Sequence, residues 1–265
     1  MKKLFSFMIL LLIGISGFPQ PENGKSIPVT TSSKSALSYY NQAMKYFDDV
    51  KLKDALENFN KALDQDKDFF MANYQLAFYY ILNRDRDHFE QYADAAISCK
   101  SKLNDAEELL KEALVRLQKG KIDVIELGKK LVDMYPGDSN SYNNLVSFQS
   151  IAGDSTGMVE TLNTAIKIVR NPASFYNQLG YAYLTLKQNE KAEAAFNRYI
   201  ELEPKNPNVY DSKGDYYMYI KKYDKAYESY MLANSMDPSF SHDKAELAKQ
   251  LYEQAEGKEL KIITM

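Results

Sequence analysis

The sequence predicts an all-α fold, an α-solenoid of about six helix-turn-helix units followed by one further helix. Three observations predict it. Gly (11) and Pro (8) are few in 265 residues, which leaves too few turn formers for a many-stranded sandwich or barrel. Apolar residues recur at intervals of three and four, as on one face of a helix. The chain also resembles itself at a spacing of 34 residues, which is typical of helical repeats.

Residues 1–18 have the pattern of a signal peptide. Lys2 and Lys3 precede an apolar run over residues 4–18, and this run is shorter than the roughly 20 residues that span a bilayer. An uncleaved anchor is the alternative. No cysteine lies near the end of the run, so the sequence has no lipobox for an acyl anchor. We expect an exported protein, periplasmic or extracellular, whose leader is removed.

Residues 19–34 contain three prolines together with Ser, Thr and Asn, and they show no helical period. This composition predicts an extended linker. Helical order is expected to begin near Ser35.

The repeat occupies residues 35–240. Six pairs of similar residues stand 34 apart in its last two copies: Tyr176 and Tyr210, Gly180 and Gly214, Tyr183 and Tyr217, Ala192 and Ala226, Phe196 and Tyr230, and Pro204 and Pro238. The small-residue column extends backward through Val146 to Ala77 and Ala43, with one extra residue inserted and Glu112 as a poor match.

Each unit is predicted to be a hairpin of two amphipathic helices. Where the two helices cross, Gly180 or Gly214 lets their axes approach, and rings such as Phe196 and Tyr230 fill the space around the contact. Proline ends the second helix because it forces the preceding residue out of the α region.

These residues resemble the tetratricopeptide repeat, whose 34-residue pattern combines an aromatic residue, Leu-Gly, Tyr, Ala, Phe, Ala and Pro. Residues 173–206 and 207–240 fit best, and residues 36–69 also fit. Between residues 70 and 138 the periodicity persists while the signature weakens. The resemblance implies a right-handed superhelix whose concave face is lined by the first helix of every unit, and ligands of the family usually lie there.

A capping helix is predicted within residues 241–257. Leu247 and Leu251 lie four apart there, and lysines and glutamates face elsewhere. A solenoid needs such a helix because an uncovered last hairpin would expose apolar surface to water. The tail, residues 258–265, is not assigned.

Helical phase predicts which side chains of the first helices point inward. This inner column changes from aromatic to polar along the chain, and Asn143 and Asn177 could clamp a peptide backbone because a carboxamide both donates and accepts. The candidate groove comprises Tyr40, Met44, Tyr74, Phe78, Asn143, Asn144, Ser147, Asn177, Gln178, Tyr181, Asp211 and Asp215. The competing interpretation is that these are core rings and solvated polar residues. The cationic clamp of the family for a terminal carboxylate is missing, since Asn177, Tyr181 and Asp211 stand in its place.

Other chemistry has little support. A formal charge of −3 and a pI near 5.6 offer no basic field for nucleic acid. Two histidines and one cysteine leave few ligands for a metal, and no motif indicates a cofactor. Residues 153–157 match the G-x-S-x-G nucleophile elbow, but they are predicted to join two helices, with Asp154 or Ser155 as an N-cap.

The preferred function is therefore non-catalytic: an envelope module that binds a peptide segment or a protein surface and scaffolds an assembly. Two alternatives remain. One is a hydrolase or enzyme accessory that uses Ser155, and the other is a structural protein that self-associates through exposed rings such as Tyr40 and Tyr74.

Overall fold

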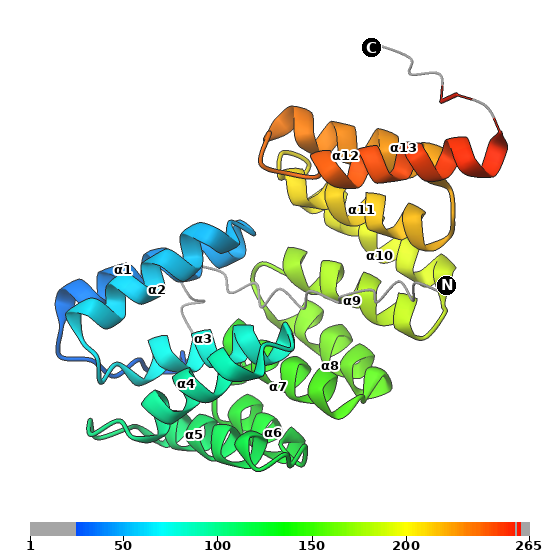
Figure 1. Ribbon diagram of the computed structural model, residues 1–265. Coiled ribbons are helices and arrows are strands. Elements are labelled where there is room, and N and C mark those ends of the chain that lie inside the picture. Colours follow the sequence, from blue (N-terminus) through cyan, green and yellow to red (C-terminus); the bar gives the residue numbers. More distant parts are fainter. Residues whose placement is uncertain (1–24, 258, 261–265) are drawn as a thin grey trace. The chain divides into compact units, whose positions relative to one another are not determined.

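The computed structural model describes residues 25–257, 259 and 260 (Figure 1). This part of the chain contains thirteen α-helices and no strand. The helices pack in consecutive pairs, which confirms the predicted all-α repeat architecture of six hairpins and a final helix. Two compact units are distinct, residues 1–171 (unit 1) and residues 172–265 (unit 2). None of the described helices is both long enough and apolar enough to span a bilayer.

Unit 1 contains four helix pairs. Its helices are α1 (Lys34–Asp48), α2 (Leu52–Gln65), α3 (Phe70–Leu82), α4 (Arg86–Ile97), α5 (Asp105–Gln118), α6 (Ile125–Met134), α7 (Ser139–Ala152) and α8 (Ser155–Ile168). The third pair is looser than the others because α6 packs more extensively on α7 than on α5. Gly128 of α6 explains this, since a Cβ atom there would lie 2.9 Å from the Cα atom of Leu145 in α7.

Unit 2 contains two helix pairs and the last helix. Its helices are α9 (Ala173–Thr185), α10 (Asn189–Leu202), α11 (Pro207–Tyr219), α12 (Tyr223–Met236) and α13 (His242–Glu256). Asn206 caps the start of α11, and Pro207 at the first helical position needs no hydrogen-bond partner for its nitrogen. The helix α13 packs on α12, as the predicted capping helix would.

The turn inside each hairpin contains one residue in the left-handed conformation. These residues are Val50 (φ 59°), Arg84 (60°), Gly120 (70°), Gly153 (74°), Lys187 (57°) and Lys221 (61°). They recur every 33 to 36 residues, so the backbone keeps the repeat even where the side-chain signature weakens. The irregular spacing falls on either side of Gly120, around the region where the sequence has its extra residue.

The predicted role of the glycine column is confirmed in unit 2. A Cβ atom on Gly180 would lie 2.6 Å from the Phe196 ring, and one on Gly214 would lie 2.4 Å from the Tyr230 ring. Each ring therefore lies directly against the backbone of the facing helix.

Three assignments made from the sequence lie partly or wholly outside the described residues. The signal peptide (1–18) lies outside them completely, as do residues 19–24 of the linker and residues 258 and 261–265 of the tail. The described part of the linker contains no helix before Lys34, in keeping with an extended segment, but it is packed: Ile27 is buried in the core of unit 1.

Candidate functional site

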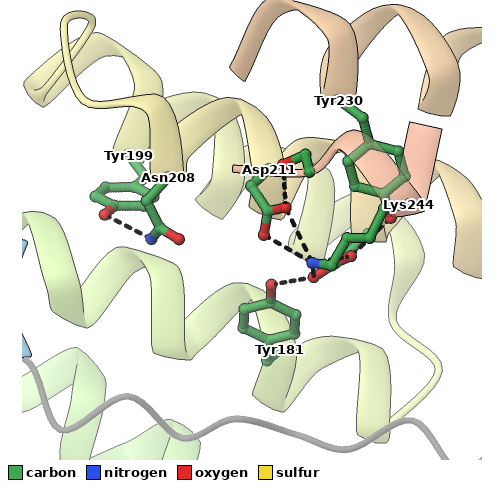
Figure 2. A network of polar contacts seen from close by, with 8 residues as sticks. Tyr181, Tyr199, Asn208, Asp211, Tyr230 and Lys244 are labelled. Carbon is green, nitrogen blue, oxygen red and sulfur yellow. Dashed lines mark hydrogen bonds and ion pairs between the residues drawn. The ribbon is translucent and has the colours of Figure 1, made fainter. Parts of the chain in front are cut away.

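A polar cluster joins four helices of unit 2. The Lys244 ammonium of α13 lies 2.8 Å from a carboxylate oxygen of Asp211 and 3.0 Å from one of Asp215, both on α11. The Tyr181 hydroxyl of α9 donates to Asp215 over 2.8 Å, and the Tyr230 hydroxyl of α12 donates to its other oxygen over 2.7 Å. Figure 2 shows Tyr181, Asp211, Tyr230 and Lys244 converging on one place. We call these five residues the unit 2 cluster.

Local sequence explains how the cluster forms. Asp211 and Asp215 are four residues apart, so they lie one above the other on one face of α11. Tyr181 and Asp215 are 34 residues apart and belong to first helices of successive repeats. Gly214 lets the Tyr230 ring approach α11 closely enough for its hydroxyl to reach Asp215.

The cluster has a net negative character, because two carboxyl groups share one ammonium. Burial raises the pKa of Asp211, and the neighbouring charge of Asp215 raises it further. Burial alone would lower the pKa of Lys244, but the two carboxylates raise it above its usual value. Burial also raises the pKa of the Tyr181 hydroxyl, which therefore stays protonated and acts as a donor.

Asn177 lies one helical turn before Tyr181 on the same face of α9. Its side chain is only 6% exposed, and its amide oxygen accepts no hydrogen bond from the described protein atoms. Such a buried acceptor is destabilising unless something donates to it. Gln178, the next residue, is also buried and has a partner of its own.

In unit 1 the predicted aromatic half of the groove lies in the core. Tyr40, Met44, Tyr74 and Phe78 are each 6% exposed or less. The rings of Tyr74 and Phe78 are tilted against each other with centroids 4.5 Å apart, and Phe78 in turn packs on Phe148 of α7 at 5.5 Å. These rings hold α3 against α7 and present little surface to a partner. The self-association hypothesis needed Tyr40 and Tyr74 exposed, and both are buried.

The predicted polar residues of α7 are buried as well. The Asn144 side chain accepts a hydrogen bond from the Tyr74 hydroxyl and donates to the carbonyl oxygen of Asn140 over 2.8 Å. The Ser147 hydroxyl donates to the carbonyl oxygen of Asn143 over 2.8 Å, and Asn143 is 1% exposed. The structure therefore brings together Tyr181, Asp211 and Asp215 of the predicted groove within unit 2, and it buries the predicted residues of unit 1 in that unit's own core.

Lys244 and Tyr230 were not among the predicted site residues. The 34-residue spacing gave no signal for Lys244, because the residue 34 positions after Asp211 is its neighbour Ala245. A second missed set, Asn104, Glu107 and Asp138, consists of helix-capping residues of unit 1.

The predicted turn at residues 153–157 is confirmed. Gly153 ends α7 in the left-handed conformation, and the Asp154 carboxylate accepts the Gly157 amide over 2.8 Å at the start of α8. Ser155 thus follows a helix, whereas a nucleophile elbow needs a strand before it. Within the described residues, no group of three or more His, Cys, Asp or Glu side chains could hold a metal ion.

The tetratricopeptide-repeat model matches residues 173–206 and 207–240, the two segments that pair α9 with α10 and α11 with α12. These two segments are similar to tetratricopeptide repeats. The unit 2 cluster thus lies mainly on the first helices of the two matched segments, with one residue from a second helix and one from the helix that follows them.

Solved structures of tetratricopeptide-repeat proteins share this fold. A thermophilic one from Thermus thermophilus is 19% identical, with 69% of this chain and 98% of that chain covered and a TM-score of 0.51. Two further structures are similar at lower TM-scores. MamA is 22% identical over 59% of this chain and 87% of that chain (TM-score 0.47). YrrB, described as having an unusual peptide-binding site, is 18% identical over 81% of this chain and 92% of that chain (TM-score 0.36). No curated protein sequence matches the chain.

Proposed function

We propose that the protein is an exported, non-catalytic interaction module that binds a peptide segment of a partner protein on the first helices of unit 2, and that it scaffolds an assembly in the cell envelope. One observation carries the proposal. Predicted groove residues of α9 and α11 do meet, at the unit 2 cluster, and Asn177 on the same face of α9 has an amide oxygen that lacks a donor.

The chemistry of these residues indicates the kind of peptide. The amide oxygen of Asn177 is enclosed in the free chain, so it would accept a backbone N–H of an extended segment once the Asn177 side chain turns outward. Asp211 and Asp215 keep 13% and 21% of their side chains exposed, and together they outweigh the charge of Lys244. Because unlike charges attract, we expect a peptide with a Lys or Arg close to the amide that meets Asn177.

Selection of binders from a displayed random-peptide library, followed by affinity measurements on the full chain, tests this proposal. Asn177→Ala should weaken binding of the selected peptides about tenfold, the loss typical of one or two hydrogen bonds. The control is Asn163→Ala on α8, whose side chain donates to the carbonyl oxygen of Val159 over 2.8 Å. Equal affinity for wild type and Asn177→Ala, at unchanged melting temperature, would refute the clamp.

Export is tested separately, since it rests on residues 1–18 alone. Cell fractionation and mass spectrometry of the native protein should find it outside the cytoplasm, with a new N-terminus close to residue 18. A cytoplasmic protein that retains Lys2 and Lys3 would contradict this part of the proposal and leave the binding proposal standing.

A further inference from the structure

Residues 25–31 form an extended segment that is held by side chains of the repeats, and we call it the N-terminal strap. The Ile27 amide donates to the Asp138 carboxylate over 2.6 Å, and the Thr30 amide donates to the Glu107 carboxylate over 2.8 Å. Asp138 and Glu107 are both fully buried. The two contacts span 111 and 77 residues of sequence, so the strap is bound as a separate peptide would be.

Further contacts complete the recognition of the strap. The Asn104 amide group donates to the carbonyl oxygen of Pro28 over 3.1 Å and to the Thr30 hydroxyl over 3.2 Å. The Thr31 hydroxyl donates to the Asp66 carboxylate over 2.6 Å. Between the two amides that donate, Pro28 has no N–H of its own to satisfy. Side chains of the repeats thus bind two N–H groups and one carbonyl oxygen of the strap's main chain. The apolar side chain of Ile27 and the two Thr hydroxyls add selectivity.

The residues that hold the strap are fixed by the helices themselves. Each of three carboxylates uses one oxygen for the strap and the other for a backbone N–H at a helix end. Glu107 accepts the backbone N–H of Asn104 over 3.1 Å, and Asp138 accepts that of Asn140 over 2.9 Å. Asp66 accepts the backbone N–H of Asp68 over 3.1 Å. Asn104 is the N-cap of α5, where it forms a capping box with Glu107. Because capping orients these groups independently of the strap, the site is preorganised for an extended peptide.

We infer that Asp66, Asn104, Glu107 and Asp138 form a second peptide-binding site, specific for extended segments of the type Ile-Pro-x-Thr-Thr, which the strap of the same chain occupies. A tethered strap has an effective concentration of about millimolar, so it excludes partner segments of similar intrinsic affinity. A partner segment with this sequence binds when the strap leaves. The site lies in unit 1 and does not depend on the unit 2 residues proposed above.

A nicking experiment on the full chain tests this inference. A protease recognition sequence is inserted between Thr31 and Ser32, and binding of a fluorescent peptide, Lys-Ser-Ile-Pro-Val-Thr-Thr, is measured before and after cleavage. We expect one peptide to bind per cleaved chain, with affinity at least about 100-fold greater than for the uncleaved chain. A peptide N-methylated at the second-last Thr lacks the donor to Glu107 and should bind about tenfold more weakly.

The matched variant is Asn104→Asp. Aspartate is as good an N-cap as asparagine, so α5 is retained, but the donor to Pro28 and Thr30 is lost. In the cleaved chain this variant should bind the peptide about tenfold more weakly at an unchanged melting temperature.

Three results would overturn the inference. One is a cleaved chain that binds no labelled peptide even when the peptide is in excess. This applies whether the cleaved chain stays folded or loses helix that added peptide does not restore. The second is equal affinity for the N-methylated and the parent peptide. The third is a dimer of the uncleaved chain that excess peptide converts to monomer, because a second copy would then supply the strap.

Discussion

The Tyr230 ring lies in the place that a side chain on Gly214 would take, and its hydroxyl donates to Asp215 on the same helix as that glycine. The small residue that lets two helices of a repeat approach therefore also brings one hydroxyl into the unit 2 cluster. At the equivalent place in the preceding repeat, Phe196 lies against Gly180 and has no hydroxyl to contribute.

Gly214→Ala should destabilise the protein. The added methyl group would lie 2.4 Å from the Tyr230 ring, which is 2% exposed and has little room to move. Overpacking outweighs the better helix propensity of alanine, so we expect the free energy of unfolding to fall by about 1–2 kcal/mol in urea titrations. In a Tyr230→Leu background the same substitution should have a much smaller effect, and equal losses in both backgrounds would argue against the contact.

Lys244→Met should destabilise unit 2, because it leaves Asp211 and Asp215 together without their cation. The Lys244 side chain is 45% exposed, so solvent screens part of the loss, and we expect a fall of about 1 kcal/mol. The control is Lys61→Met, which removes only a surface pair with Glu57 and should leave the urea midpoint unchanged. A Lys244→Met variant as stable as the control would contradict the role of the cluster.

Asp211 should make unit 2 less stable as the pH rises. Burial and then the charge of Asp215 raise its pKa above the usual value of 3.8, so the folded chain retains a proton that the unfolded chain releases. Its contribution to stability is present below pH 3.8 and is lost as the pH rises through the folded-state pKa. Urea titrations over this range should show wild type losing stability relative to Asp211→Asn.

Glu193 supplies the opposite sign as a control. Burial would raise its pKa, but the hydrogen bond and charge of Lys213, with smaller effects of Tyr216 and Lys222, together outweigh burial and lower the pKa below the usual value of 4.5. Its contribution is present above pH 4.5 and is lost as the pH falls through the folded-state pKa. Wild type should therefore lose stability relative to Glu193→Gln on acidification, and difference curves of the same sign for both variants would refute these assignments.

Val50→Gly should stabilise unit 1. Val50 has φ 59°, a conformation that is unfavourable for a β-branched residue, whereas the equivalent turns at 120 and 153 use glycine. Relief of this strain exceeds the entropy that glycine loses on folding, so thermal or urea unfolding should show a gain of about 0.5–1 kcal/mol. Gly120→Val is the reverse substitution in open space and should destabilise.

Tyr74→Phe should cost about 1–2 kcal/mol, because it leaves the buried amide oxygen of Asn144 without its donor. Tyr210→Phe is the matched control: its hydroxyl donates to the carbonyl oxygen of Pro204 at an exposed position. Urea titrations that give the two variants the same stability would show that the α3–α7 contact is not made through this bond.

The hairpins and the glycine contacts could be predicted because both are local. Gly180 and Phe196 are 16 residues apart, and a hairpin with a short turn brings them together whatever the rest of the chain does. The sequence indicated where the third hairpin lies but not how its helices pack. The close contact of Gly128 in α6 is with α7 and not with α5, the partner of α6 in that hairpin.

The surroundings of the inner column were less predictable. Helical phase predicts the direction in which a side chain points, but not which other helices pack against it. Tyr74 and Asn143 were predicted to line the groove, yet both are buried in unit 1, where residues of α3 contact α7. The change from aromatic to polar residues along the column does not predict this burial, since Asn143 is polar and buried whereas Asp211 and Asp215 remain partly exposed.

The amino-acid sequence by itself determined the helical pairs, their number and the place of each small residue, because these follow from spacing along one chain. Tertiary structure alone decided that Lys244 joins the two aspartates, that Tyr74 bonds to Asn144 and that the N-terminal strap lies on three carboxylates. The physical reason is that these contacts join residues about 30 to 110 positions apart. Their partners are selected by side-chain packing in three dimensions, which no repeat length specifies.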